Sequence, residues 1–369
     1  MNFADKKKIV IKIGSALLVA NGKLREKWLK KFSAQVADLV KNNFQIIVVS
    51  SGAVALGRGA LGLTEKKLSL PQKQAAAAIG QIKLMSFYRD FFAKEKVEVA
   101  QILLTAADCN ARDRYLNCKN TIENLLQNHV VPIINENDSV SVDEIKIGDN
   151  DRLAARVAQM ADADLLVLFS DIDGLYDANP KTNAKAKFIE EIFEINSAIE
   201  KMAGSSVSEV GTGGMITKIL AAKMLKNSSC DVVITSGLID GALKNLFAKK
   251  QKFSIFYSKK TAPKSRKTWL SGFLNAKGEV TINGCAVEVL LSKKASLLPV
   301  GVVAAKGDFK AGDAIFIKDE QGNHIASGVS NYAVSEVKKI FEKNSAEVKK
   351  ILGAAAKKEL VHIDNLVLV

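Results

Sequence analysis

Three short polar segments carry the residue types that could hold an amino acid beside a phosphate donor. Two of them lie close together in the middle of the chain, Asn-Glu-Asn-Asp at 135–138 and Gly-Asp-Asn-Asp at 148–151. Their amides and carboxylates can bind the ammonium group of an amino acid. The third, Gly-Thr-Gly-Gly-Met-Ile-Thr-Lys at 211–218, offers backbone N–H groups and a lysine, which can bind phosphates. An amino-acid site next to a nucleotide site predicts a kinase.

Two further polar segments follow apolar runs of strand length. Lys12 and Gly14 end the first run, and Ser51 and Gly52 follow the second. Gly14 lets the backbone approach phosphate oxygens, and Lys12 can offset charge on a transferred phosphoryl group. A turn into a helix at Ser51 and Gly52 would present N–H groups and a hydroxyl to an anion. The alternatives are a surface lysine and an ordinary helix cap.

Other candidates also have structural interpretations. Asp151, just before a helical pattern, is either an N-cap or an acceptor that orients two lysines. Ser170 and Asp171 close a strand, where they could contact the base or ribose of a nucleotide or form a turn. The segment 211–218 lacks the GxxxxGK[ST] order of a P-loop, so it holds phosphate differently or is a surface loop. Gly-Arg-Gly-Ala-Leu-Gly at 57–62 begins too far after its strand for a dinucleotide fingerprint.

Apolar runs alternate with helical patterns through the first 240 residues. Such alternation predicts an α/β fold with a mostly parallel sheet between helices, and ligands at the carboxyl ends of the strands. Apolar spacings of three and four predict amphipathic helices at 25–41 and 152–160. The expected strands are 9–13, 45–49, 97–103, 130–134, 165–169 and 232–235.

The pattern changes after about residue 260. Short β-type segments separated by turns predict a small β-rich module with a compact, barrel-like sheet. We therefore expect a catalytic domain at 1–258, a basic linker at 259–276 and the β-rich domain with the C-terminal tail at 277–369. Nine basic residues and no acidic one fall in 244–267, which indicates a solvated surface or a polyanion contact. The expected β segments are 278–282, 286–291, 301–305, 314–317 and 324–328.

The charge and composition of the chain indicate which classes of protein it can belong to. The formal net charge of +14 suits an anionic ligand but is also compatible with simple solubility. Four cysteines without CxxC spacing and only three histidines make a zinc site unlikely, and no metal site is expected within the protein. An apolar run of about 18 residues is missing, so no membrane span is expected. A reduced, cytoplasmic protein fits best.

The motifs taken together resemble the glutamate 5-kinase family, a branch of the amino-acid kinases. The likeness covers nearly the whole chain, because Ser-Leu-Leu-Pro at 296–299 and Gly-Val-Ser-Asn-Tyr at 328–332 resemble the C-terminal PUA domain of many members. The pair of central motifs, combined with a PUA tail, is specific to this branch. The motifs that carry the resemblance are Lys-Ile-Gly-Ser at 12–15, Ser-Gly-Ala at 51–53, Asn-Glu-Asn-Asp at 135–138, Ile-Gly-Asp-Asn-Asp at 147–151, Ser-Asp at 170–171 and the glycine segment 211–218.

The resemblance implies an amino-acid-kinase fold and ATP-dependent conversion of L-glutamate to γ-glutamyl phosphate, the first step of proline synthesis. Catalysis would involve Lys12 and Lys218, held in place by Asp151. Mg²⁺ would be bound mainly by ATP oxygens, because no cluster of acidic ligands is evident. The implied ATP-binding residues are Lys12, Gly14, Ser170, Asp171, Thr212, Gly213, Gly214, Met215, Ile216, Thr217 and Lys218. The implied glutamate-binding residues are Ser51, Gly52, Asn135, Asp138 and Asn150.

Two departures from the family pattern concern affinity more than activity. Ser15 and Ala16 replace the commoner pair of hydroxyl residues, and Ser170 stands where threonine is usual. The family also suggests a homo-oligomer, feedback inhibition by proline and glutamate-5-semialdehyde dehydrogenase as a partner. Two alternatives stay open: an RNA-binding protein acting through the PUA-like tail, and a kinase for acetylglutamate, aspartate or UMP.

Overall fold

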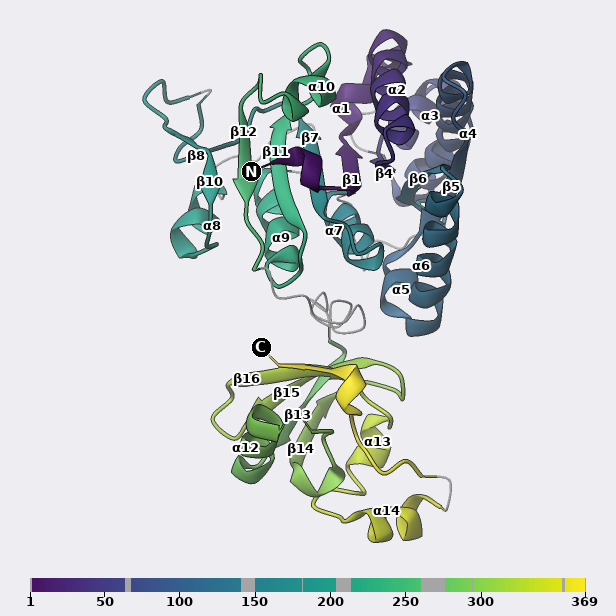
Figure 1. Cartoon of the computed structure of the whole chain (residues 1–369). Helices are drawn as coiled ribbons and strands as arrows, with labels where there is room; N and C mark the ends of the chain where they lie inside the picture. The colour runs from purple at the N-terminus through teal and green to yellow at the C-terminus, as the bar shows by residue number, and fades with distance from the viewer. Residues whose placement is uncertain are drawn as a thin grey trace. The chain divides into compact units, whose positions relative to one another are not determined.

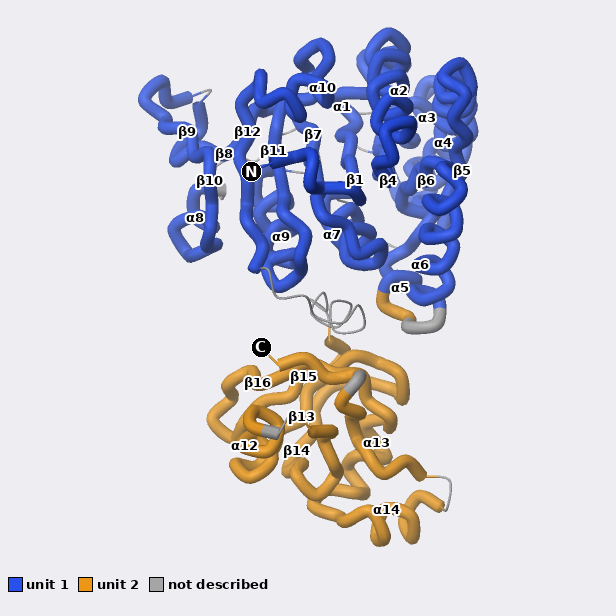
Figure 2. The backbone as a smooth tube through the Cα atoms, viewed as in Figure 1, with its two compact units in different colours: residues 1–109, 113–261 blue, residues 110–112, 262–369 orange. Residues whose placement is uncertain are grey.

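The computed structural model describes most of the chain, in two compact units. One unit comprises 1–109 and 113–261, and the other comprises 110–112 and 262–369 (Figure 2). Among the described residues, no helix has the length and apolar composition needed to cross a bilayer. The described residues are 2–63, 68–140, 150–180, 182–203, 214–259, 276–293, 295–353 and 356–368.

An eight-stranded sheet forms the centre of the first unit, with the strand order β10-β12-β11-β7-β1-β4-β6-β5 (Figure 1). The strands from β11 to β5 are parallel, whereas β12 runs antiparallel to β11. Strands β1, β4, β6 and β7 are buried almost throughout, as expected for parallel strands covered on both faces. The strands are β1 (Lys8–Ile13), β4 (Gln45–Ser50), β5 (Val99–Leu104), β6 (Val131–Glu136), β7 (Leu165–Ser170), β10 (Glu191–Ile192), β11 (Asp231–Ser236) and β12 (Phe253–Phe256).

Helices and two small hairpins complete this unit. The hairpins pair β2 (Val19–Ala20) with β3 (Lys23–Leu24) and β8 (Leu175–Tyr176) with β9 (Phe188–Ile189). The helices are α1 (Ser15–Leu18), α2 (Glu26–Lys41), α3 (Ala53–Arg58), α4 (Leu70–Lys94), α5 (Ala106–Asn110), α6 (Arg112–Gln127), α7 (Asn150–Met160), α8 (Ser197–Ala203), α9 (Met215–Leu225) and α10 (Ala242–Phe247), with 3-10 turns at Phe3–Asp5 and Gly59–Leu61.

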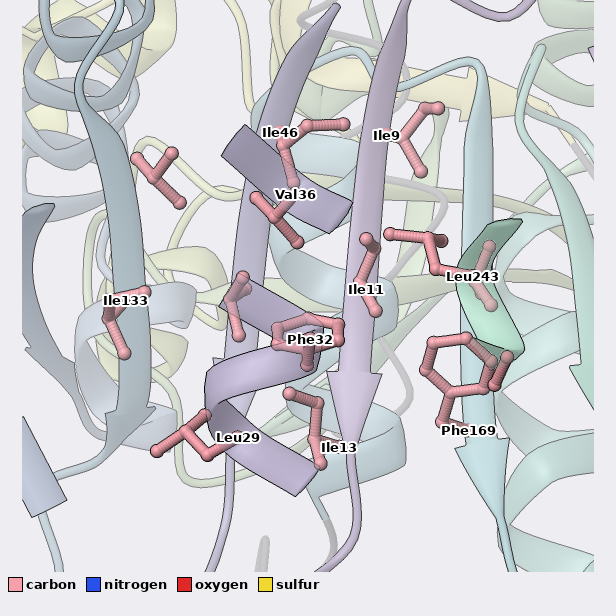
Figure 3. Packing of buried hydrophobic residues seen from close by; sticks show 14 of the residues in the cluster. Ile9, Ile11, Ile13, Leu29, Phe32, Val36, Ile46, Ile133, Phe169 and Leu243 are labelled. Carbon is pink, nitrogen blue, oxygen red and sulfur yellow. The ribbon is translucent and has the colours of Figure 1, made fainter. Parts of the chain in front are cut away.

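Opposite faces of β1 have different neighbours. Because successive side chains of a strand point to opposite faces, Lys12 lies on the face opposite to that of Ile11 and Ile13. Helix α7 packs against β1, and its Asp151 contacts Lys12, so α7 lies on the face of the sheet that carries Lys12. The opposite face of β1 packs against α2 in one apolar cluster. The residues of β1 and α2 in this apolar cluster are Ile9, Ile11, Ile13, Leu29, Phe32 and Val36 (Figure 3).

Two glycines bring helices α3 and α4 into backbone contact. A Cβ on Gly57 would lie 1.8 Å from Ala76 O, and a Cβ on Gly80 would lie 1.7 Å from Ala53 O. Neither distance is sterically allowed, so only glycine permits this approach. Gly57, the first glycine of the 57–62 segment, therefore serves close helix packing.

The second unit has its own five-stranded sheet and apolar core. Its strand order is β14-β13-β15-β16-β17. The elements are β13 (Gly278–Ile282), α12 (Gly284–Lys293), β14 (Val302–Gly307), β15 (Ala314–Asp319), β16 (His324–Val329), α13 (Val334–Val337), α14 (Ser345–Leu352) and β17 (Leu366–Leu368), with 3-10 turns at Pro299–Gly301 and Ile363–Asn365.

One expected element of the second unit is wrong. The β segment predicted at 286–291 lies inside helix α12. The sequence Ala-Val-Glu-Val there alternates as a strand does, but Asn283 Oδ1 accepts a hydrogen bond from the Ala286 backbone N–H at 2.9 Å and starts a helix. Leu290 of this helix is buried in the core of the unit. Packing therefore overrides the local β pattern.

Candidate active site

Several expected site residues meet at the carboxyl edge of the large sheet. Lys12 lies near the end of β1, Asn135 near the end of β6, and Ser170 closes β7. Ser51 directly follows β4. Helices α7 and α9 supply Asn150, Asp151 and Lys218, so four parallel strands and two helices contribute to this edge, as the rule for open α/β sheets predicts.

Lys12, Asp151 and Lys218, here called the lysine–aspartate cluster, form a buried group of charges. Lys12 Nζ lies 2.7 Å from Asp151 Oδ1, and Lys218 Nζ lies 3.0 Å from Asp151 Oδ2. The exposed fractions are 7% for Lys12, 4% for Lys218 and 0% for Asp151. Two ammonium groups share one carboxylate, so the cluster carries one surplus positive charge in a place with little water. Such a surplus favours an anion.

Local structure explains how these three side chains meet. Helix α7 begins at Asn150, so Asp151 lies in its first turn and not at an N-cap; a carboxylate there is favoured by the helix dipole. Gly214, in extended conformation, is the N-cap of α9, and Lys218 follows about one turn later. Thr217 Oγ1 donates to Asp151 Oδ2 at 2.8 Å. The Asp151 carboxylate, which α7 carries, is thus held in place by side chains of β1 and α9.

The charge state of Asp151 follows from its neighbours. Burial alone would raise the pKa of this carboxyl group, but the nearby Lys12 and Lys218 ammonium groups outweigh burial and hold the pKa below its usual value. Asp151 is therefore ionised at neutral pH. It can hold both lysines toward a phosphate without taking up a proton.

A second group of polar side chains lies at the ends of β4 and β6. Asn150 Nδ2 contacts Ser50 O at 3.1 Å, Ser51 Oγ at 2.7 Å and Asn135 Oδ1 at 3.0 Å. The structure thus brings together three of the expected glutamate-binding residues. Asn150 and Asp151 are consecutive in α7, so the lysine–aspartate cluster and this second group share one helix N-terminus.

Asp138 and Gly52 lie at the margins of this second group. Asp138 is half-buried just beyond β6, and burial raises the pKa of its carboxyl group. Gly52 has φ of 105° and is the N-cap of α3, a left-handed conformation that favours glycine. The turn after β4 therefore depends on Gly52.

Ser170 and Asp171 lie at the end of β7 beside the loop that follows β11. Ser170 Oγ donates to Asp171 Oδ1 at 3.1 Å, and the Gly237 backbone N–H donates to Ser170 O at 2.8 Å. Trp28 Nε1 of α2 donates to Gly237 O at 2.6 Å. Gly237 is therefore held from two sides, which fixes the loop next to the expected nucleotide contact.

Part of the expected nucleotide segment is described and part is not. Gly148, Asp149, Thr212 and Gly213 lie outside the described residues. Of the described part, Met215 is buried, whereas Ile216 is exposed at the start of α9. Gly14 is half-buried directly after β1, where a Cβ would lie 3.8 Å from Lys12 Nζ.

Metal-ligating side chains and cysteine thiols are two further kinds of group that could take part in chemistry. Within the described part of the chain, no group of three His, Cys, Asp or Glu side chains could hold a metal ion. Cys109 is buried, and burial raises the pKa of its thiol to about 11, which opposes a nucleophilic role.

Known proteins with similar sequences identify the family. The model of the amino acid kinase family matches residues 7–236, and the model of the PUA domain matches residues 278–352. The chain is 44% identical to the glutamate 5-kinase of Carboxydothermus hydrogenoformans over 365 residues, which are 98% of each chain. It is also 44% identical to the glutamate 5-kinase of Pelagibacter ubique over 368 residues, 100% of each chain. The chain belongs to the glutamate 5-kinase family.

Solved structures of other kinases share the fold of the first unit. UMP kinase from Ureaplasma parvum matches 69% of this chain and 99% of its own, with a TM-score of 0.51 and 17% identity. Carbamate kinase from Giardia lamblia bound to AMP-PNP has a TM-score of 0.50, also at 17% identity, with 69% and 99% of the two chains covered. The expected family, α/β fold and C-terminal PUA domain are thus confirmed.

Three side chains next to the site were not predicted from the sequence. Gln81 Oε1 accepts from Asn135 Nδ2 at 2.9 Å, and Tyr88 Oη lies 2.9 Å from Ser50 Oγ. Both come from α4, and Trp28 comes from α2. The helical pattern could have shown that Gln81 and Tyr88 are buried and that Trp28 is half-buried, but it carried no signal of what each would contact.

Proposed function

We propose that this kinase transfers the γ-phosphoryl group of ATP to the γ-carboxylate of L-glutamate, as the first step of proline biosynthesis. The observation that carries the proposal is the lysine–aspartate cluster beside Ser51, Asn135 and Asn150. A surplus positive charge suits a phosphoryl group in transfer, and the amides and hydroxyl suit an amino acid. The full-length similarity to glutamate 5-kinases supports glutamate as the acceptor.

In this mechanism, the protein positions two reactants and offsets charge. The γ-carboxylate of glutamate is already ionised at pH 7, so its attack on phosphorus requires no general base. This fits the sequence, in which the three histidines are at 129, 324 and 362, away from every expected site segment. Lys12 and Lys218 would stabilise the charge that builds up on the transferring group, and Asp151 would keep both in place.

ATP and Mg²⁺ fit the side chains that the structure describes. Gly14, Ser170, Asp171 and the start of α9 would bind the nucleotide, with Thr212 and Gly213 completing the phosphate contacts. Because the described residues hold no acidic metal cluster, Mg²⁺ would be bound mainly by phosphate oxygens. When bound, Mg²⁺ would help to neutralise the charge of the phosphates.

A comparison of acceptors tests the proposed reaction. The purified protein is incubated with ATP, Mg²⁺, hydroxylamine and one acceptor at a time, and acyl phosphate is trapped as hydroxamate. We expect hydroxamate with L-glutamate and little with acetylglutamate or aspartate, and no ADP formation that depends on UMP. A clear preference for any of the other three acceptors would contradict the proposal.

Asp138→Ala should chiefly weaken glutamate binding. A carboxylate that faces the substrate ammonium acts in the ground state and the transition state alike, so the KM for glutamate should rise about 10- to 100-fold with little change in kcat. The KM for ATP should stay the same. Initial rates with each substrate varied in turn provide the measurement, and a rise confined to the KM for ATP would show that Asp138 does not serve the amino acid.

A chain that ends near Lys260 should fold and keep kinase activity. The proposed catalytic domain, 1–258, contains all the proposed phosphate and glutamate residues, and the first compact unit ends at 261. The measurement compares the circular dichroism spectrum and kcat of the truncated and full-length chains. An insoluble or inactive truncated protein would mean that the 277–369 domain completes the catalytic unit.

Other inferences rest on family membership alone. We infer a homo-oligomer, inhibition by proline, and glutamate-5-semialdehyde dehydrogenase as the enzyme that consumes the product. RNA binding by the PUA unit is supported only by the match of that domain. An RNA-binding main function is less well supported, because it leaves the lysine–aspartate cluster without a role.

A further inference from the structure

Four side chains form a continuous line of hydrogen bonds at the proposed glutamate site, here called the polar row: Gln81, Asn135, Asn150 and Ser51. Gln81 Oε1 accepts from Asn135 Nδ2 at 2.9 Å, Asn135 Oδ1 accepts from Asn150 Nδ2 at 3.0 Å, and Asn150 Nδ2 also donates to Ser51 Oγ at 2.7 Å. The row runs from helix α4 to the turn after β4.

Backbone groups determine which end of each amide faces its neighbour. The Glu136 backbone N–H donates to Asn135 Oδ1 at 2.9 Å, so the Nδ2 of Asn135 must face Gln81. The third acceptor near Asn150 Nδ2 is the backbone oxygen of Ser50, which can only accept; the two hydrogens of Nδ2 serve three acceptors, so one hydrogen is shared. The oxygen and nitrogen ends of both asparagines are thus assigned by groups whose roles cannot be exchanged.

This polarity decides what the Ser51 hydroxyl group can do. Ser51 Oγ receives a hydrogen from Asn150 Nδ2, so Ser51 keeps its own hydroxyl hydrogen for another acceptor. A substrate carboxylate is such an acceptor, and a hydrogen bond to a charged group is stronger than one between neutral groups. The polar row therefore leaves the Ser51 hydroxyl group available to donate a hydrogen bond to an anionic substrate.

Gln81 is expected to lower the stability of the fold, so its presence calls for a role in the polar row. It is 9% exposed, and among the described residues its Nε2 has no hydrogen-bond partner. A buried amide that is only half satisfied lowers stability compared with an apolar side chain of the same size. In the part of the chain that the structure describes, the side chain of Gln81 hydrogen-bonds to Asn135. Gly80, the preceding residue, lets α4 approach the backbone of α3 at Ala53.

We propose that Gln81 is a positioning residue for the acceptor substrate. It holds Asn135 so that Asn135 and Asn150 keep the Ser51 hydroxyl hydrogen aimed at a carboxylate of the amino acid. This inference rests on the proposed function, because it assumes that the amino acid binds at Ser51. Gln81 does not touch the reacting atoms, so it should affect binding of the acceptor more than the phosphoryl-transfer step.

The Gln81→Met variant tests this role. Methionine fills a similar volume without an acceptor, and it also removes the unpaired Nε2, so the variant should fold. The KM for glutamate should rise about 10-fold, whereas the KM for ATP and kcat should change less than about twofold. The matched control is Gln159→Met on α7, where Gln159 is also buried but donates to Met224 O. The control should leave both KM values unchanged.

Two further variants separate positioning from general packing. If Gln81 acts through Ser51, Gln81→Met should add little to the effect of Ser51→Ala on the KM for glutamate, because the group that Gln81 orients is already lost. Gln81→Glu keeps an acceptor oxygen toward Asn135 Nδ2, and burial favours its neutral form, so it should restore much of the glutamate affinity.

The outcomes distinguish this inference from the proposed function. Additive effects of Gln81→Met and Ser51→Ala, an unchanged KM in Gln81→Met, or equal losses in Gln81→Met and Gln81→Glu would each overturn the positioning role. A Gln81→Met protein that does not fold, while Gln81→Glu is as active as the unmodified protein, would still support the need for the acceptor. Failure of the proposed function would instead be seen in the unmodified protein, as a lack of activity with glutamate.

Discussion

Replacing Lys218 by alanine is expected to lower kcat by roughly 10²- to 10³-fold, the scale for loss of one preorganised charge-stabilising group. The KM for glutamate should change much less, since Lys218 lies in the lysine–aspartate cluster and not among the amides. The fold should survive, because Asp151 keeps its contacts with Lys12 at 2.7 Å and with Thr217 at 2.8 Å. Steady-state rates with saturating ATP and glutamate give the measurement.

Lys223 offers a matched control on the same helix. It is an exposed lysine of α9 whose Nζ lies 2.5 Å from Glu200 Oε1. Lys223→Ala removes the same charge at a distance of about one and a half helical turns, so kcat should stay the same. Near-normal turnover in a folded Lys218→Ala protein, or an equal loss in Lys223→Ala, would remove Lys218 from the proposed mechanism.

Replacing Asp151 by asparagine is expected to damage both stability and turnover. The change leaves Lys12 and Lys218 nearly buried without their shared carboxylate, and breaking a buried ion pair in this way costs about 3–5 kcal/mol. Turnover should also fall, by at least about 10²-fold, because neither lysine would be held toward the phosphate. Urea unfolding at pH 7 and steady-state rates measure the two effects.

The stability loss in Asp151→Asn should depend on pH in a defined direction. The Asp151 carboxyl has a pKa below its ordinary value in the folded protein, so its contribution is fully present above the unfolded pKa of about 4. That contribution is lost as the pH falls through the lower, folded pKa. The difference in unfolding free energy between the unmodified protein and Asp151→Asn should therefore shrink below about pH 4.

An exposed ion pair provides the control for Asp151. Lys31 Nζ lies 2.6 Å from Asp240 Oδ2, with both side chains largely exposed. Asp240→Asn should have little measurable effect on unfolding, since solvent screens such pairs. If Asp151→Asn were as harmless as Asp240→Asn, the lysine–aspartate cluster would not be a source of stability.

The sequence predicted the parallel strands well for a physical reason. Strands buried on both faces need apolar residues throughout, so runs such as 165–169 are visible without any knowledge of their neighbours. Strand ends were placed within two residues at each of the six expected strands. The segment 286–291 was misjudged because a short run of alternating residues fits a helix once a cap and an apolar core favour it.

The site was predictable only in part. Motifs indicated Lys12, Asp151 and Lys218, but their contacts depend on side-chain alternation along β1 and on where α7 and α9 begin. Gln81 and Tyr88 could not be predicted, because their partners, Asn135 and Ser50, lie on strands that are distant in the sequence. Short polar motifs reveal the residues at the ends of strands, whereas the helix residues that support them depend on tertiary packing.

The transfer of an oxygen atom tests the central claim most directly. L-Glutamate labelled with ¹⁸O in the γ-carboxylate is incubated with ATP, Mg²⁺ and hydroxylamine. Hydroxylamine attacks the acyl carbon of γ-glutamyl phosphate and expels phosphate together with the oxygen that joined carbon to phosphorus. If the carboxylate attacks the γ-phosphorus, each hydroxamate formed should be matched by one phosphate that carries one ¹⁸O atom. Phosphate without ¹⁸O, or no hydroxamate from glutamate, would contradict the account.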